Sequence, residues 1–258
     1  MEKHENSNSV KSIMKAFAII ELLNDAGPLS ISELSNHLSM DKATVHRLIN
    51  TIKQAGYVIQ NPETKKYSNS IKLFEIGQNV ITKTGLFEAA RPHIEALASA
   101  TGESINLGIV KDNEIIYVDK KEGKSTIKVG IKIGTSVPMH CTGMGKAVLA
   151  FMNKNVRDEI ISRIEYIPYS KNSPLDRKTV EQRLEETARN GYSMDSEEYV
   201  NDLISYGAPI FGYKGEPVAA ISISFPKSRL NENEMGKEFP DLIKTAALNI
   251  SRQMGYIV

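Results

Sequence analysis

The apolar and polar positions over residues 29–58 predict two short helices joined by a tight turn and followed by a strand. Apolar side chains in the second helix recur at intervals of three and four residues, which places them on one buried stripe: Val45, Leu48, Ile49 and Ile52. Asp41 precedes this helix and is suited to accept backbone N–H groups at its start. Gly56 follows its end, where a left-handed residue commonly closes a helix.

The pattern continues over residues 57–70, YVIQNPETKKYSNS, as two short strands with a turn at Asn61-Pro62. A further helix over residues 10–24 precedes the pair and ends at Gly27-Pro28. We expect the buried face of that first helix to consist of Ile13, Phe17, Ile20, Leu22 and Leu23. Helices joined by a turn and followed by a hairpin are typical of a winged helix-turn-helix.

Residues 70–83 form another amphipathic pattern, and Gly85 marks a boundary between this part and the rest of the chain. We then expect helices over 86–100, 145–152, 176–190 and 239–254. We expect strands over 105–110, 114–119, 127–133, 203–211 and 218–225. Strands in runs with helices at both ends favour an α+β fold with one central, mainly antiparallel sheet.

Charge is concentrated in the predicted winged helix. Residues 40–70 hold five basic and two acidic side chains, a local net charge of +3, whereas the whole chain has a formal net charge of +1. The exposed face of the second helix has hydrogen-bonding side chains and no carboxylate, as a helix in a DNA major groove requires. The residues expected to contact DNA are Lys42, Thr44, His46, Arg47, Asn50 and Thr51 on the helix, with Lys65 and Lys66 on the wing.

Composition narrows the class of protein. A chain of 258 residues is long enough for two domains, and no apolar run approaches the roughly 18–20 residues of a membrane span. The polar N-terminus lacks an apolar signal core, and Cys141 is the single cysteine. We therefore expect a cytoplasmic protein that contacts no membrane and has no intrachain disulfide. The histidines show no metal-ligand spacing, so neither a metal site nor a cofactor is predicted.

The segment HCTGMGKA could be read as a phosphate-binding loop or as part of an enzyme active site. It is no phosphate-binding P-loop, because His140 stands where that motif has a glycine and Ala147 follows Lys146. A hydrolase or transferase using His140, Cys141 or Asp195 is an alternative function, although neighbouring residues of an extended chain point to opposite faces. A scaffold whose winged helix binds protein is a second alternative. We expect that this protein is not an enzyme and that none of its residues is catalytic.

Several segments in the right order resemble the IclR family of bacterial transcriptional regulators. They are SVKSIMKAFAIIELL at 9–23, DKATVHRLINTIKQAGYV at 41–58, KKYSNSIKLFEIG at 65–77, PMHCTGMGKAVLAF at 138–151, GYSMDSEE at 191–198 and GAPIFGYKGEPVAAISISFPKSRL at 207–230. The resemblance is greatest to repressors of pectin and hexuronate catabolism that respond to 2-keto-3-deoxygluconate.

The resemblance implies a domain plan. It comprises a disordered tail over 1–9, a winged helix-turn-helix over 10–70, a linker helix over 71–84 and a GAF-like effector-binding and oligomerisation domain over 85–258. The implied partners are double-stranded operator DNA, a small carboxylate effector and further copies of the chain, as a homodimer or a tetramer. The implied function is regulation of a catabolic operon, as a repressor.

The family's effector site maps onto Gly143, Met144, Asp195, Ser205, Ser222 and Ser224. Backbone N–H groups at a helix start favour an anion, and alternate residues of one strand, such as Ser222 and Ser224, point to the same face. Asp195 would repel a second carboxylate, so we expect it to accept a bond from a ligand hydroxyl. Family members often have cysteine where this chain has Ser205, which makes this site more polar.

Overall fold

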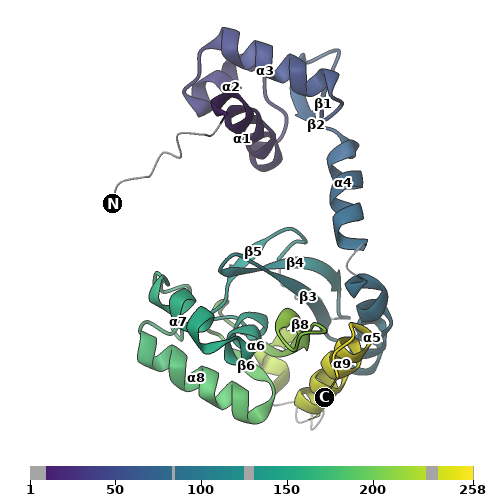
Figure 1. The fold of residues 1–258 in the computed structure, drawn as a ribbon, viewed down its shortest axis with the longest axis vertical. Helices are drawn as coiled ribbons and strands as arrows, with labels where there is room; N and C mark the ends of the chain where they lie inside the picture. The colour runs from purple at the N-terminus through teal and green to yellow at the C-terminus, as the bar shows by residue number, and fades with distance from the viewer. Residues whose placement is uncertain (1–9, 83–84, 125–130, 231–237, 258) are drawn as a thin grey trace. The chain divides into compact units, whose positions relative to one another are not determined.

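In a computed structural model, residues 10–82, 85–124, 131–230 and 238–257 are described, and the chain forms two compact units, residues 1–83 and 84–258 (Figure 1). The expected tail over 1–9 lies outside the described residues. Nowhere in the described part of the chain is a helix both long and apolar enough to cross a membrane.

The first unit is a winged helix-turn-helix, as its sequence predicts. Its elements are α1 (Lys11–Ala26), α2 (Ile31–Leu38), α3 (Lys42–Gln54), β1 (Val58–Gln60), β2 (Tyr67–Asn69) and α4 (Ile71–Thr82). Ser30 and Glu33 form a capping box at the start of α2, and Asp41 accepts the N–H of Thr44 at 2.8 Å to begin α3. Gly56 is left-handed after α3, with φ of +86°. The expected stripe of α3 is buried throughout.

The buried face expected for α1 is wrong in part. Ile19 and Leu23 are its buried residues, whereas Ile13 and Phe17 are 51% and 56% exposed. The helix carries two apolar stripes, and the one that continues through Ile19 and Leu23 packs with the core of this unit. The other stripe stays on the surface of the unit: Val10, Ile13, Met14 and Phe17.

The second unit is built on one six-stranded antiparallel sheet with the order β5-β4-β3-β8-β7-β6. Its strands are β3 (Ser104–Lys111), β4 (Glu114–Lys121), β5 (Ser136–Pro138), β6 (Ser193–Ser196), β7 (Leu203–Phe211) and β8 (Pro217–Pro226). Its helices are α5 (Leu86–Thr101), α6 (Gly143–Phe151), α7 (Lys154–Ser162), α8 (Arg177–Asn190) and α9 (Phe239–Gln253), with a 3₁₀ turn, η1, at Lys227–Leu230.

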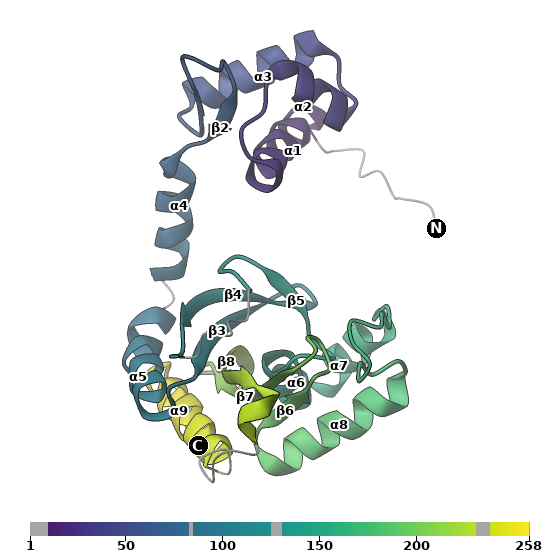
Figure 2. The same ribbon diagram turned by 180° about the vertical axis from the view of Figure 1, so that it is seen from behind.

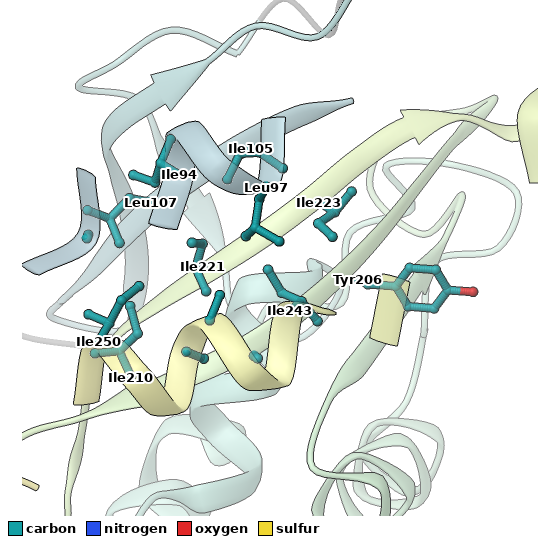
Figure 3. Packing of buried hydrophobic residues seen from close by; sticks show 14 of the residues in the cluster. Ile94, Leu97, Ile105, Leu107, Tyr206, Ile210, Ile221, Ile223, Ile243 and Ile250 are labelled. Atoms are coloured by element: carbon teal, nitrogen blue, oxygen red, sulfur yellow. The ribbon is translucent and has the colours of Figure 1, made fainter. Parts of the chain in front are cut away.

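Helices cover both faces of this sheet (Figure 2). On one face α5 and α9 lie side by side, and their apolar residues pack with Ile105, Ile221 and Ile223 (Figure 3). On the other face α6 lies against the strands, and α7 and α8 complete a second apolar cluster. All residues of α6 from Gly143 to Ala150 are buried, which explains why this helix is apolar around most of its circumference.

Three expectations for this unit need correction. The strand expected over 127–133 is wrong for residues 131–133, where Thr135 N–H bonds to Lys132 O at 3.1 Å in a turn, and residues 127–130 lie outside the described ranges. The edge of β4 is paired by β5 instead. α6 begins at Gly143, two residues earlier than expected, because Thr142 accepts the N–H of Gly145 at 3.2 Å. Finally, β5, β6 and α7 were not predicted; the two strands are three and four residues long.

Candidate functional site

The exposed face of α3 presents the polar side chains predicted for DNA contact. Lys42, His46, Arg47 and Thr51 are exposed, and Thr44 and Asn50 are half-buried. Asn50 Nδ2 lies 3.3 Å from the ring nitrogens of His46, and Thr51 Oγ1 donates to Arg47 O at 2.9 Å. Within the described residues, the Arg47 side chain has no hydrogen bond or ion pair. It is therefore available to bind an external acceptor.

The two adjacent lysines of the wing, Lys65 and Lys66, have different surroundings. Asn61 Oδ1 accepts the N–H groups of Glu63 and Thr64, both at 2.9 Å, and Lys65 adopts a left-handed φ of +58°, so the turn has a defined shape. Lys66 Nζ lies 3.0 Å from Glu33 Oε1 in α2. The backbone N–H of Ser30 and the Lys66 ammonium lower the pKa of Glu33 to about 2, so this carboxylate stays charged at neutral pH.

A polar patch crosses the face of the sheet that α6 covers. Asn106 Nδ2 donates to Ser222 Oγ at 3.2 Å and to Ser224 Oγ at 3.1 Å, and Ser224 Oγ donates to Ser205 Oγ at 3.1 Å. Strand register places Asp195 beside Ser205, and Ser205 beside Ser224. The predicted hydroxyls therefore lie together, while Ile221, Ile223 and Phe225 enter the opposite core, as the alternation predicts.

The N-terminus of α6 sits directly on β7. A Cβ atom at Gly207 would lie 2.4 Å from Gly143 O, and one at Gly143 would lie 2.9 Å from Ser205 Oγ, so only glycines allow this contact. Ser193 Oγ donates to Gly143 O. Among the described residues, no acceptor takes the N–H groups of Gly143 and Met144, which is the arrangement that binds anions at helix starts.

A small cavity lies between this helix start and the polar patch. It is lined by Asn106, Tyr117, Lys120, Ile131, Thr142, Gly143, Asp195, Tyr199, Leu203, Ser205 and Ser224. The cavity holds about 10 Å³, room for about one water molecule. Met144 and Ser222 are not on its wall: Met144 belongs to the apolar cluster under α6, and Ser222 contacts the wall residue Asn106. A larger ligand can enter only if the wall moves.

Sequence reasoning missed Asn106, Tyr117, Lys120 and Tyr199 on this wall. Lys120 contributes a positive charge to this wall, and its Nζ lies 3.0 Å from Glu122 Oε1. Its position beside Asn106 comes from the register of β3 and β4. Tyr117 and Lys120 are three residues apart across a β-bulge, so no simple alternation marks them, and only the strand pairing identifies which residues face the cavity.

Buried charges surround Asp195. Burial is the main cause that raises its pKa to about 7, and the nearby Glu198 carboxylate raises it further, against the opposing effects of Lys146 and the N–H of Glu198, which bonds to Oδ1 at 2.7 Å. Lys146 and Glu198 form a fully buried ion pair, and Arg183 Nη1 lies 2.8 Å from the same carboxylate oxygen. Asp195 is thus poised between its charged and neutral forms near pH 7.

His140 and Cys141 do not form an activated nucleophile. Burial raises the pKa of the Cys141 thiol far above its usual range, so it stays protonated, which disfavours nucleophilic chemistry. Burial and the Lys146 ammonium lower the pKa of His140 to about 4. Across the residues that the structure describes, no three His, Cys, Asp or Glu side chains are placed to hold a metal ion.

Comparison with known proteins gives consistent matches along the chain. Residues 12–62 match the IclR helix-turn-helix domain, and residues 78–252 match the bacterial transcriptional regulator IclR C-terminal domain. The HTH-type transcriptional regulators KdgR of Dickeya chrysanthemi and Escherichia coli K12 are 34% and 32% identical over 96% of this chain, which covers 81% and 94% of their lengths.

Solved structures match as well. The crystal structure of Thermotoga maritima IclR, 29% identical, covers 96% of this chain and all of its own, with a TM-score of 0.80. The C-terminal domain of Escherichia coli KdgR, 30% identical, covers 66% of this chain and 99% of its own, with a TM-score of 0.60.

Proposed function

Because the chain belongs to the IclR family of bacterial transcriptional regulators, we propose that it represses a catabolic operon and is controlled by a small hydroxylated or keto carboxylic acid. It is a DNA-binding regulator of transcription. Repression and the class of effector are the new elements of this proposal, with 2-keto-3-deoxygluconate as the first compound to test. We expect the protein to act in the cytoplasm.

The proposal that this chain binds DNA through α3 rests on the exposed face of that helix. Lys42, His46 and Arg47 are exposed together on a helix without carboxylates on that side, and the wing that follows carries the exposed Lys65. Bidentate donors such as arginine read guanine edges, whereas lysines neutralise phosphates. Arg47 is therefore the residue that we assign to base contact.

A net charge of only +3 over residues 40–70 lets one copy bind DNA weakly by itself, so we propose that two copies bind a near-palindromic site. The exposed stripe of α1, formed by Val10, Ile13, Met14 and Phe17, supports this, because such a row of apolar side chains favours burial against another protein surface. The expected assembly is a homodimer or a pair of dimers. Sedimentation of the wild type and of Phe17→Ser tests the dimer surface.

The effector part rests on complementary chemistry around one cavity. The N–H of Gly143 and the Lys120 ammonium favour a carboxylate, and Ser205 and Ser224 offer hydroxyls. Asp195, on the same wall, favours a ligand that donates a hydroxyl. A hydroxylated keto acid meets both demands. Since the cavity holds about 10 Å³, such a ligand must displace the wall, and this movement provides a difference between the free and bound states.

Calorimetric titration of 2-keto-3-deoxygluconate with and without operator DNA tests the proposal. A ligand that controls DNA binding must have different affinities for the free and DNA-bound protein, since the coupling is reciprocal. Ser224→Ala removes a hydroxyl from the cavity wall, and together with Ser222→Ala it removes both acceptors that hold the Asn106 amide on that wall. At roughly 0.5–1.5 kcal/mol for each of these two effects, ligand affinity should fall about fivefold or more.

The matched control for that titration is Ser228→Ala, on the exposed turn η1, which should leave ligand affinity unchanged. DNA binding by the ligand-free double variant should also be retained. Identical ligand affinities with and without DNA would refute effector control by this compound.

A further inference from the structure

A second hollow opens on the other side of the loop that forms the effector cavity. It has a volume of about 220 Å³ and lies between the β3–β4 turn, the end of β5 and the residues that follow α7. Its lining is Asn113, Glu114, Pro138, Met139, His140, Ile160, Arg163, Ile164, Glu165, Ile167 and Tyr169. We call this hollow the His140 cleft. Unlike the effector cavity, it is large enough for a small organic molecule.

His140, which lines the cleft, carries an unpaired polar atom just beneath the surface of the cleft. The His140 side chain is 3% exposed, and its Nε2 atom has no hydrogen-bond partner among the described residues. A buried nitrogen left without a partner is costly, and in native proteins it usually binds a water molecule or a ligand. Its ring is neutral at physiological pH, because burial lowers its pKa to about 4. A neutral imidazole nitrogen binds a hydroxyl in either tautomer, since a hydroxyl both donates and accepts.

The rest of the wall selects for an apolar, planar body. Tyr169 contributes its ring, with its centroid 6.3 Å from that of His140, and Ile160, Ile164 and Ile167 supply aliphatic surface. Aromatic side chains favour edge-on or offset contact with another ring.

The charges of the cleft do not favour an anion. Glu114 and Glu165 carry two negative charges, whereas Arg163 is held 2.6 Å from Glu159 in an ion pair. The effector cavity differs in having the N–H of Gly143 at the start of α6 on its wall, which favours an anion.

We propose that the His140 cleft is a binding site for a small, uncharged planar molecule that carries a hydroxyl group, a phenol in chemical class, distinct from the carboxylate effector. The ring lies against Tyr169 and the isoleucines, and a small rotation of the His140 side chain lets its Nε2 bond to the hydroxyl. Loop residues 139–143 connect the sites, because His140 lines the cleft while Gly143 lines the effector cavity. Tyr169 and Tyr199, with ring centroids 5.1 Å apart, form the wall between them. The site is thus placed for a second signal.

Ligand-observed NMR titration of the full-length protein with phenol and with toluene tests the proposal. Phenol should bind the wild type, and His140→Phe should weaken phenol roughly three- to tenfold relative to toluene, since only phenol loses a hydrogen bond. Comparing the two ligands in both proteins cancels the difference in their hydrophobicity. No detectable phenol binding at about 10 mM, or a phenol-to-toluene ratio unchanged by His140→Phe, would overturn the proposal.

A second pair of variants locates the site without altering the buried histidine. Ile167 is 44% exposed on the rim, so Ile167→Trp should fill the cleft and weaken both ligands at least about tenfold. Leu175→Trp, at a site 57% exposed and outside the cleft, is the control and should leave both affinities unchanged. Phenol binding that survives Ile167→Trp would mean that phenol binds elsewhere. The double variant of Ser222 and Ser224 should retain phenol binding, which separates this site from the effector cavity.

Discussion

Lys66 Nζ lies 3.0 Å from Glu33 Oε1, so one of the two adjacent wing lysines is paired inside the DNA-binding unit. The same carboxylate accepts the N–H of Ser30 at 2.7 Å in the capping box of α2. The wing is thereby joined to the first helix of the helix-turn-helix, and Lys66 contributes to the shape of the unit. Lys65, its neighbour, makes no such side-chain contact within the described residues.

The two wing lysines should therefore differ in their effect on DNA binding. Lys65→Ala should weaken binding to all DNA sequences and reduce the slope of log affinity against log salt by about 1, because one phosphate contact is lost. Lys66→Ala should change that slope less, since its ammonium is already neutralised by Glu33. Salt titrations of DNA affinity provide the measurement. Equal slope changes for both variants would contradict this assignment.

Arg47→Ala should reduce affinity for the native operator by about 1–3 kcal/mol, the usual contribution of a bidentate base contact. Binding to unrelated DNA should change much less. Arg189→Ala removes the same charge from an exposed position of α8 and is the matched control. Gel-shift titrations on operator DNA and on scrambled DNA measure both effects. If Arg47→Ala leaves the affinity for the operator unchanged, Arg47 does not contact a base.

Gly207→Ala should destabilise the effector unit by about 1–3 kcal/mol, because the added methyl group would lie 2.4 Å from Gly143 O and force β7 and α6 apart. Gly77→Ala is the control with the opposite sign. It lies in α4 with nothing within 4 Å of the new methyl group, so it should gain stability by about 0.4–1 kcal/mol. Urea denaturation measures both. A Gly207→Ala protein as stable as the wild type would show that this contact tolerates expansion.

The first unit was largely predictable because its signals are local. Asp41, the stripe from Val45 to Ile52 and Gly56 lie within one helix length, and the structure confirms each of them. The orientation of α1 was not predictable in full. Its two apolar stripes have the same period, and only contacts with the rest of the unit decide which of them is buried.

The effector cavity was predictable only in part, since its walls come from segments far apart in the sequence. The alternation of Ser222 and Ser224 with apolar residues predicted their common face, and the structure confirms it. Lys120 and Asn106 reach the same patch through strand pairing across β3, β4 and β8, which no short pattern encodes. Strands as short as β5 contain too few residues to display an alternation at all.

Stability should depend on pH through Asp195. Folding raises the pKa of this carboxyl from 3.8 to about 7, so the folded protein keeps a proton that the unfolded chain has released. The contribution of Asp195 to the free energy of unfolding is fully present below about pH 4. It decreases as the pH rises towards 7 and stays constant above that. Asp195→Asn should remove that fall. Urea denaturation between pH 4 and pH 8 compares the two proteins, and parallel curves would contradict the assignment of the titration to Asp195.

The near absence of free volume around Ser205 and Ser224 has a consequence for the sensitivity of the regulator. If the binding-competent form is only a small fraction of the population, the apparent dissociation constant rises in inverse proportion to that fraction. The concentration at which the gene responds is then set by the ease of opening as much as by contacts with the ligand. Substitutions in the apolar cluster beneath α6, at positions such as Met144 that are not on the cavity wall, can therefore retune the detection threshold without altering which compound is recognised.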